Sequence, residues 1–519
     1  MKTPIRFFFT LLCAAIVSVQ SVHAATFHIP DGNVTALIVA IFTSNANGED
    51  DTIELATNGT YTLTVVNNIV NGQNGLPVIL SDNGHKLVIH GNGATLQRST
   101  AGGTLNFRIF YIGAGANVTI SGLTITNGSA SGAFSDNAGG GIYNDHATLM
   151  VTDSTLSGNS AGFGGGIFSD AVVGSATLTI NNSTLSDNSA SIAGGGINQD
   201  SFMGSATLTI SNSTLSGNSA GDFGGGIVNN SGLVGGSGAT LTVNNSTLSG
   251  NSAFSEGGGI WNGFGLTLTI GSTILNAGAS GENIFNEAGT VTSLGYNLSS
   301  DDASALLNQT TDQNSTDPKL GPLVDNGGPT FTHALCTASG VPDASCTGAS
   351  PAIDQGKNFS GSATDQRGFF RTFDNFSIPN APSGDGTDIG AFEVQATVCP
   401  EGQGFWKNNP AAWPASALPM TLGSQTYTTK SQLLKILKTP IKGNAVLILA
   451  DQLIAAKLNI ANANGTPVAS TITNADSLLT GHPIGSHVKT SSSTGQAMVN
   501  DANVLDNYNN GVMTPGCGL

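Results

Sequence analysis

Four copies of one motif decide the fold of this chain. They read DSTLSGNSAGFGGGI (153–167), NSTLSDNSASIAGGGI (182–197), NSTLSGNSAGDFGGGI (212–227) and NSTLSGNSAFSEGGGI (245–260). The serine of each STL triplet follows the previous one after 29, 30 and 33 residues. A repeat period of this size is typical of a solenoid in which each unit packs only on its neighbours.

An alternating stretch such as TLTINN (177–182) or TLTISN (207–212) precedes each copy, with an apolar residue at every second position. This alternation indicates a half-buried strand. One leucine column and one isoleucine column recur as well: Leu156, Leu185, Leu215 and Leu248; Ile142, Ile167, Ile197, Ile227 and Ile260. Three short strands per unit therefore predict an all-β parallel β-helix whose coils stack about 4.8 Å apart.

The turns between these strands carry recurring asparagine and glycine. Asn159, Asn188, Asn218 and Asn251 form a column that we expect to stack at one turn as a ladder of amides, in a left-handed conformation that Asn tolerates. The glycine triplets allow sharp bends where a side chain would clash.

The GGGI…NSTLSGNSA repeat resembles secreted bacterial right-handed parallel β-helix proteins of the pectate-lyase-like architecture, and the GGAI-type repeats of polymorphic outer-membrane proteins. Further along come DPKLGPLVDNGGPTFTHAL (317–335), SPAIDQG (350–356), TDQRG (364–368) and DIGAFE (388–393). This series resembles the choice-of-anchor Q module, which commonly ends such β-helices. The resemblance implies an exported surface protein of a family that mostly has no established activity.

The chain divides by composition into five parts. We expect a signal peptide at 1–24, a cap helix within 25–50, the parallel β-helix at 51–300, the choice-of-anchor Q-like module at 301–396 and a small α-helical domain at 397–519. Lys2 and Arg6 precede the apolar core of the signal peptide, and VTALIVAIFTSN (34–45) has the helical spacing of the cap. In the last part, KSQLLKILK, NAVLILADQLIAAKLNIA and SSTGQAMVNDANVLDNY show helical spacing.

Export would place the cysteines in an oxidising compartment. Four remain after removal of the signal peptide, so three pairings are open. We favour Cys336–Cys346 as a clip across one loop and Cys399–Cys517 as a clasp around the last domain.

The charge distribution excludes several partners. The formal net charge is −17, and the segment between Arg108 and Lys319 contains no Lys or Arg but fourteen Asp and Glu. Nucleic acid needs a basic face, so it is excluded as a ligand. The same lack of bases disfavours an anionic membrane surface and a lyase for polyuronates. The sequence outside the N-terminus has no apolar run long enough for a transmembrane segment.

Three aspartates are candidates for a metal-binding site. Asp145, Asp170 and Asp200 each follow a glycine triplet at the same spacing, so they should stack on successive coils. Three interpretations are open: a Ca²⁺-binding column, a glycosidase carboxylate pair, or ordinary turn residues. We favour the turn interpretation, and we expect no cofactor other than this possible Ca²⁺.

Aromatic residues give the speculative carbohydrate-binding candidates. Tyr143, Phe168 and Trp261 share one column, and Trp406 and Trp413 lie together in GFWKNNPAAW. Each set could stack on a sugar, but ordinary packing is the favoured interpretation. Asp365, Arg367, Asp388 and Glu393 are expected to form a buried ion-pair network with a structural role.

The sequence thus predicts an exported, non-enzymatic β-helix protein that is adhesin-like or part of an extracellular matrix. The alternative is a carbohydrate-active enzyme or a glycan-binding protein on the same fold, since β-helices host both. Cell-surface or extracellular glycans are the expected partners, and the oligomeric state is left open.

Overall fold

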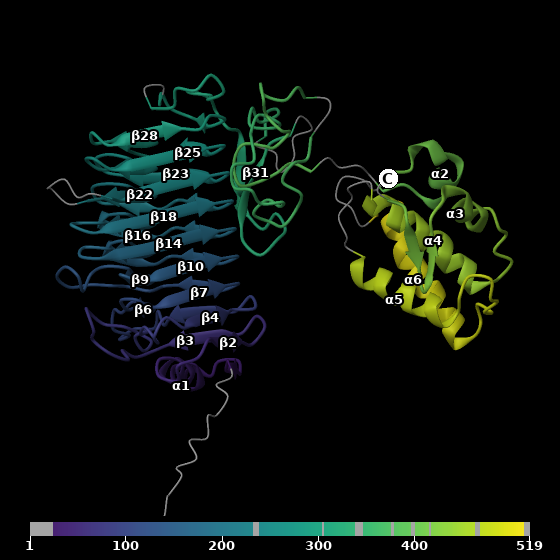
Figure 1. The fold of residues 1–519 in the computed structure, drawn as a ribbon, viewed down its shortest axis with the longest axis horizontal. Coiled ribbons are helices and arrows are strands. Elements are labelled where there is room, and N and C mark those ends of the chain that lie inside the picture. Colours follow the sequence, from purple (N-terminus) through teal and green to yellow (C-terminus); the bar gives the residue numbers. More distant parts are fainter. Residues whose placement is uncertain are drawn as a thin grey trace, which may run out of the picture. The chain divides into compact units, whose positions relative to one another are not determined.

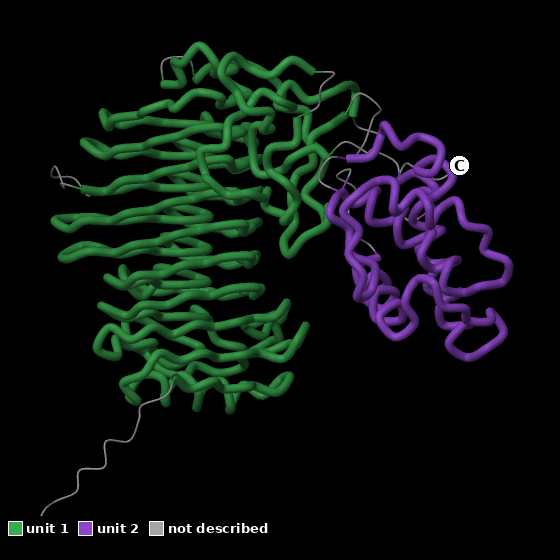
Figure 2. The backbone as a smooth tube through the Cα atoms, turned by 45° about the vertical axis from the view of Figure 1, so that its right-hand side comes forward, with its two compact units in different colours: residues 1–395 green, residues 396–519 purple. Residues whose placement is uncertain are grey.

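The structure is a computed structural model that describes residues 24–231, 238–303, 306–337, 346–374, 378–395, 400–414, 417–461 and 468–512. The chain forms two compact units, residues 1–395 and 396–519, drawn in two colours in Figure 2. The predicted signal peptide lies outside the described residues, except for Ala24.

The first unit is a parallel β-helix, as predicted (Figure 1). Its strands form three parallel sheets, called here the first, second and third sheet. The first sheet contains β1 (Thr26–Ile29), β2 (Asp51–Leu55), β4 (Lys86–His90), β7 (Asn117–Ser121), β10 (Thr148–Thr152), β14 (Ser175–Asn181), β18 (Ser205–Ser211), β22 (Thr240–Asn244), β25 (Thr267–Gly271) and β28 (Thr290–Ser293).

The other two sheets run beside it along the same stack. The second sheet contains β3 (Thr60–Leu63), β5 (Thr95–Arg98), β8 (Thr124–Thr126), β11 (Thr155–Ser157), β15 (Thr184–Ser186), β19 (Thr214–Ser216), β23 (Thr247–Ala253), β26 (Ile274–Ala277) and β29 (Leu298–Ser299), with β12 (Ser160–Phe163), β16 (Ser189–Ala193) and β20 (Ser219–Ala220) joined through β23. The third sheet contains β6 (Phe110–Ile112), β9 (Ile142–Asp145), β13 (Ile167–Asp170), β17 (Ile197–Asp200), β21 (Ile227–Asn230), β24 (Ile260–Asn262) and β27 (Ile284–Asn286).

The predicted apolar columns line the interior. Leu156 pairs in register with Leu185, and Ile167 pairs with Ile197, so like side chains stack on like. All the leucines and isoleucines of the two columns are buried in one continuous core. Stacking identical side chains coil after coil removes apolar surface from water at every rung, and this burial is the main favourable term for the fold.

The asparagine column is a buried ladder, which confirms the predicted stacking. The Asn188 amide donates to Asn218 Oδ1 (3.0 Å) and to the Leu156 carbonyl (2.9 Å), while Asn188 Oδ1 accepts from Asn159 Nδ2 (2.9 Å). The predicted left-handed conformation belongs to the preceding residue, for example Asp187 (φ 54°) or Gly217 (φ 65°). The asparagines themselves are turned inward because their amides satisfy backbone groups that the turn leaves without partners.

The glycine triplets sit where the backbones of neighbouring coils approach closely. A Cβ on Gly195 would lie 2.4 Å from the Ser219 carbonyl oxygen and 2.5 Å from that of Gly225. Only glycine fits at such a backbone contact, which explains the recurrence of the triplet.

The predicted cap helix is α1 (Val34–Ser44), which begins after Asn33, whose side chain accepts a hydrogen bond from the Ala36 amide (3.0 Å). Leu37 and Ile41 are buried in the solenoid core. The range predicted for the cap also contains β1, which pairs with β2 and starts the first sheet.

The terminal module, residues 301–395, contains one antiparallel pair, β30 (Leu320–Val324) and β31 (Thr332–Leu335). The strand pair lies beside the stacked strands (Figure 1). The start of the module instead covers the last coil, since Ala303 and Leu307 are buried in the solenoid core and Gln313 forms a parallel bridge with Leu298. The predicted disulfide between Cys336 and Cys346 is present, with a Cα–Cα distance of 5.4 Å.

The second unit is mainly helical, as predicted. It contains α2 (Gln403–Asn408), the 3₁₀ turn η1 (Pro410–Ala412), the hairpin β32 (Met420–Leu422) and β33 (Gln425–Tyr427), α3 (Lys430–Leu437), α4 (Ala445–Ala461), α5 (Ala469–Gly481) and α6 (Ser493–Asn509). The three predicted helices correspond to α3, α4 and α6. Cys399 and Cys517 lie outside the described residues, so their pairing stays a prediction.

Within the described ranges, none of the helices has the length and apolar character needed to span a bilayer.

Candidate functional site

The predicted aspartate column exists on the third sheet. Asp145 (β9), Asp170 (β13) and Asp200 (β17) are in register on adjacent strands, and Asn230 continues the column. Each aspartate is the last residue of its strand, so the three residues lie at the same edge of the sheet.

Two tyrosines on preceding coils hold the first two carboxylates. Tyr143 donates its hydroxyl hydrogen to Asp170 Oδ2 (2.7 Å), and Tyr111 donates to Asp145 Oδ2. Burial raises the pKa of both phenols above the ordinary value, and the neighbouring carboxylates add to this shift, so both hydroxyls keep their protons and act as donors.

A histidine that the sequence analysis did not select joins the pair. The Nδ1 atom of His146 contacts Asp145 Oδ1, and its Nε2 atom accepts a hydrogen bond from the Val173 amide (3.2 Å). Ligand atoms of Asp145, His146 and Asp170 lie within 4.8 Å of one another. His146 directly follows the column residue Asp145, and that adjacency was the sequence signal for it.

The donor set is a poor match for the predicted Ca²⁺. This ion takes six to eight oxygen ligands, whereas the group offers two carboxylates and an imidazole, a set closer to that of a transition metal. Asp200 is not part of the group that comes together. Burial raises the pKa of Asp200, so its charged form is less favoured than in water. The carboxylates of Asp145 and Asp170 have protein hydrogen-bond donors already, which supports the structural interpretation.

Arg108, the last base before the cation-free segment, is buried beneath these tyrosines. Its guanidinium carbon lies 4.9 Å from the ring centroid of Tyr143, and the Arg108 side chain donates to the backbone carbonyls of Asn71 (2.6 Å) and Asp136 (2.9 Å). Burial lowers its pKa to about 10, which leaves it charged at neutral pH. Arg108 therefore fastens two loops to the third sheet.

The predicted aromatic column is present but covered. Tyr143, Phe168 and Trp261 occupy one register column with Asn198 and Val228. Tyr143 and Phe168 are each 1% exposed and Trp261 is 9% exposed. A sugar ring stacks on an open aromatic face, so this burial argues against carbohydrate binding by these side chains.

The two tryptophans of the second unit are also interior. Trp406 is 1% exposed and donates its indole N–H to Asn459 Oδ1 (3.1 Å), while Trp413 is 4% exposed and donates to the Trp406 carbonyl (2.8 Å). They belong to the apolar core of the helical unit, which is the packing interpretation.

The repeat has a second use that sequence reasoning missed, because the terminal module docks on it. Thr184 donates its hydroxyl hydrogen to the Phe331 carbonyl (2.6 Å), Thr214 donates to Gln366 Oε1 (2.6 Å), and Thr247 Oγ1 accepts from the Ala391 amide (3.0 Å). These are the threonines of three successive STL triplets. We call this contact the docking seam.

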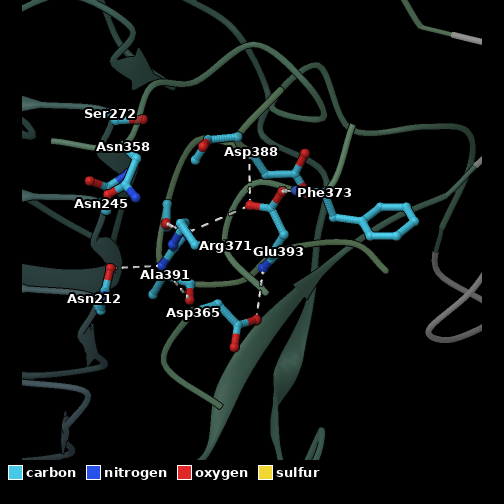
Figure 3. A network of polar contacts seen from close by, with 12 residues as sticks. Asn212, Asn245, Ser272, Asn358, Asp365, Arg371, Phe373, Asp388, Ala391 and Glu393 are labelled. Atoms are coloured by element: carbon cyan, nitrogen blue, oxygen red, sulfur yellow. Dashed lines mark hydrogen bonds and ion pairs between the residues drawn. The ribbon is translucent and has the colours of Figure 1, made fainter. Parts of the chain in front are cut away.

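A buried polar network fixes the seam (Figure 3). Arg371, which is fully buried, donates to Asn212 Oδ1 (2.9 Å) on the solenoid and to the Gly390 carbonyl (2.7 Å) in the module. Its guanidinium lies 3.8 Å from Glu393 Oε2. Arg371 was not among the selected residues, because a lone base after two phenylalanines carries no motif of its own.

Of the four residues predicted to form a buried ion-pair network, Asp365, Asp388 and Glu393 are buried, Arg367 is half-buried, and only Arg367 and Asp365 form an ion pair with each other. Glu393 faces Arg371 instead, and Asp388 accepts from the backbone amides of Asp354 and Val394. Arg367 binds Asp365 Oδ2 through Nε (2.9 Å) and Nη2 (2.7 Å). Glu393 accepts from the Asp388 amide (3.0 Å). Burial raises the pKa of Asp388 to about 8 and that of Glu393 well above its ordinary value, since more carboxylates than guanidiniums are enclosed here.

In comparisons with known proteins, no family model matches the chain, and no curated protein matches it.

Proposed function

We propose that this chain is an exported, non-enzymatic β-helix protein that serves at the cell surface or in an extracellular matrix. One observation carries the proposal. Three sets of recurring polar side chains are bonded within the solenoid or to the docked module: the asparagine ladder, the docking-seam threonines, and the aspartates held by tyrosines. Repeated residues used for scaffolding favour a structural role.

The terminal module supports the family resemblance. We propose that residues 301–396 form a choice-of-anchor Q-like module on a pectate-lyase-like β-helix. The signature stretches SPAIDQG, TDQRG and DIGAFE supply Asp354, Asp365, Asp388 and Glu393, which are all buried in the described part of the module. Residues that recur in such a signature would thus form the polar core that holds the module on the coils.

A glycan-directed activity is the second candidate, and the Asp145–Asp170 pair is the observation that favours it. Retaining glycosidases place two carboxyl groups about 5–5.5 Å apart, and ligand atoms of this pair lie within 4.8 Å of one another. The bonded state of both carboxylates and the burial of the nearby aromatics weigh against this candidate.

Incubation of the mature chain with neutral and acidic glycans, scored for new reducing ends and unsaturated products, separates the two candidates. We expect no turnover. Turnover that is lost in Asp170→Ala but kept in Asp153→Ala, a turn aspartate outside the column, would overturn the structural proposal. Binding of the chain to an array of glycans and cells, measured with and without residues 396–519, would then identify the partner of the β-helix.

A further inference from the structure

The first sheet presents a regular array of threonines on its outer surface. Five adjacent strands, β14, β18, β22, β25 and β28, each carry two outward-facing threonines separated by one inward-facing apolar residue. The array comprises Thr177 and Thr179, Thr207 and Thr209, Thr240 and Thr242, Thr267 and Thr269, and Thr290 and Thr292. We call it the threonine face.

The array is regular in both directions. Thr177 pairs with Thr207, which pairs with Thr240, and the second column follows the same register from Thr179 to Thr292. Neighbouring strands lie about 4.8 Å apart, and residues two apart on a strand are about 6.7 Å apart. Stacked coils keep a sheet flatter than an open, twisted one, and the strands lie parallel to one another along the stack (Figure 1).

The face is uncharged and its hydroxyl groups are available to solvent. All ten threonine side chains are exposed or half-buried, and none of them makes a side-chain hydrogen bond to another residue of the described ranges. The flanking outward positions hold Ser175, Ser205, Asn181, Ser211 and Asn244. No charged or aromatic side chain stands on these five strands.

We propose that the threonine face binds crystalline water, that is, the surface of ice. Each threonine offers a hydroxyl that can anchor a water molecule and a methyl group that restricts its neighbours. The two repeats of the array are close to the oxygen repeats on the prism surface of hexagonal ice. The stiff χ1 angle of threonine holds both groups in place, so a layer of water can adopt that order at little entropic cost.

The chemistry of the face distinguishes ice from a polysaccharide surface. Sugar rings are recognised by aromatic stacking together with a few directed polar groups. The threonine face repeats one side chain at regular distances and contains no aromatic group. A crystal lattice is also periodic, so it can match such an array at many points at once. This inference concerns a different surface from the docking seam and does not depend on the proposed surface role.

The test uses the mature chain, residues 25–519, in water at temperatures just below melting. We expect a gap between the melting and the freezing temperatures, and enrichment of fluorescently labelled protein in a growing ice hemisphere. The double substitution Thr209→Tyr and Thr242→Tyr places two bulky rings side by side in the second column. It should abolish both signals.

The matched control is Thr155→Tyr, which changes a half-buried, outward-facing threonine on the second sheet. This variant should keep both signals, and circular dichroism melts should show that all variants fold. Absence of ice adsorption, or adsorption that the double substitution leaves unchanged, would overturn the proposal. Threonine-dependent binding to microcrystalline cellulose or chitin without ice adsorption would overturn it as well, by assigning the face to a polysaccharide.

Discussion

Buried amides need hydrogen-bond partners in a solenoid interior, and the asparagine column shows how they are stable there. The two inner amides, Asn188 and Asn218, both donate and accept within the column and also reach a backbone carbonyl of the preceding coil. A buried polar group that is fully bonded costs little, whereas one that loses its partner costs its full desolvation penalty. The ladder therefore fixes the register of the coils more strictly than leucine stacking alone.

Replacement of one rung tests this argument. We expect Asn188→Ala to lower the free energy of unfolding by about 2–4 kcal/mol, because the buried backbone N–H of Asn159 loses its acceptor and Asn159 Nδ2 loses one of its two acceptors. The control is Asn181→Ala on the outer surface of the same coil, which should change it by less than about 0.5 kcal/mol. Denaturant unfolding measures both, and equal effects would contradict the ladder argument.

The aspartate column leads to a prediction about metal ions, namely that added Ca²⁺ does not stabilise the protein. Because Tyr111 and Tyr143 already donate to Asp145 and Asp170, we expect millimolar Ca²⁺ or its removal by a chelator to leave the melting temperature unchanged. Differential scanning calorimetry provides the measurement. A saturable rise in melting temperature that Asp170→Asn removes and Asp153→Asn retains would show that a cation site is present.

At the scale of elements, regular segments were predictable and irregular ones were not. The period-two pattern around Leu178 and Ile180 fixed the first sheet because one face of each strand is buried. The strand β1 and the helix α5 were missed, since β1 has only Ile29 buried and α5 has only Ala475 and Leu479 buried. So few interior contacts leave a weak pattern in the sequence.

The candidate site was predictable only as far as the repeat extended. The aspartate column follows from the coil register, and the structure confirms it. Part of the cover over Phe168 comes from Phe134, which lies outside the repeat, and the docking seam joins Thr214 to Gln366, which are 152 residues apart. Contacts of this range have no periodic signal, so the sequence could predict a buried network in the module but not its attachment to the coils.

The stability of the terminal module should depend on pH. The pKa of Asp388 is about 8 in the folded protein because of burial, while the unfolded chain releases this proton at its ordinary value of 3.8. The folded state thus binds the extra proton, and the free energy of unfolding should fall as the pH rises from near 4 to about 8. Above that range this contribution is constant.

Measurement between about pH 7 and 9 avoids the titration of histidine. Over this interval Asp388→Asn should flatten the fall in stability, whatever its effect on the absolute value. Asp325→Asn, at an exposed position of the same module, should leave the slope of the native chain unchanged. A slope that persists in Asp388→Asn would assign the pH dependence to another group.

At the scale of the whole molecule, a solenoid has ends that can pair with other chains. The sheets of this protein are continuous from coil to coil, so an uncovered terminal coil would present unpaired backbone groups and an open apolar core. The helix α1 meets this need at the N-terminal end, where Leu37 and Ile41 are inserted into the core while Phe42 is 57% exposed.

This arrangement predicts that the cap controls association. Ile41→Asp would place a charge in the apolar core beneath α1, so the helix should detach and the chain should form higher oligomers as its concentration rises. Phe42→Asp changes the outer surface of the same helix and should leave the molecular mass as it is in the native chain. Size-exclusion chromatography with light scattering distinguishes the two. If Ile41→Asp kept the native mass at every concentration, the exposed end of the solenoid would not be the source of association, and α1 would be an accessory to the fold rather than its cover.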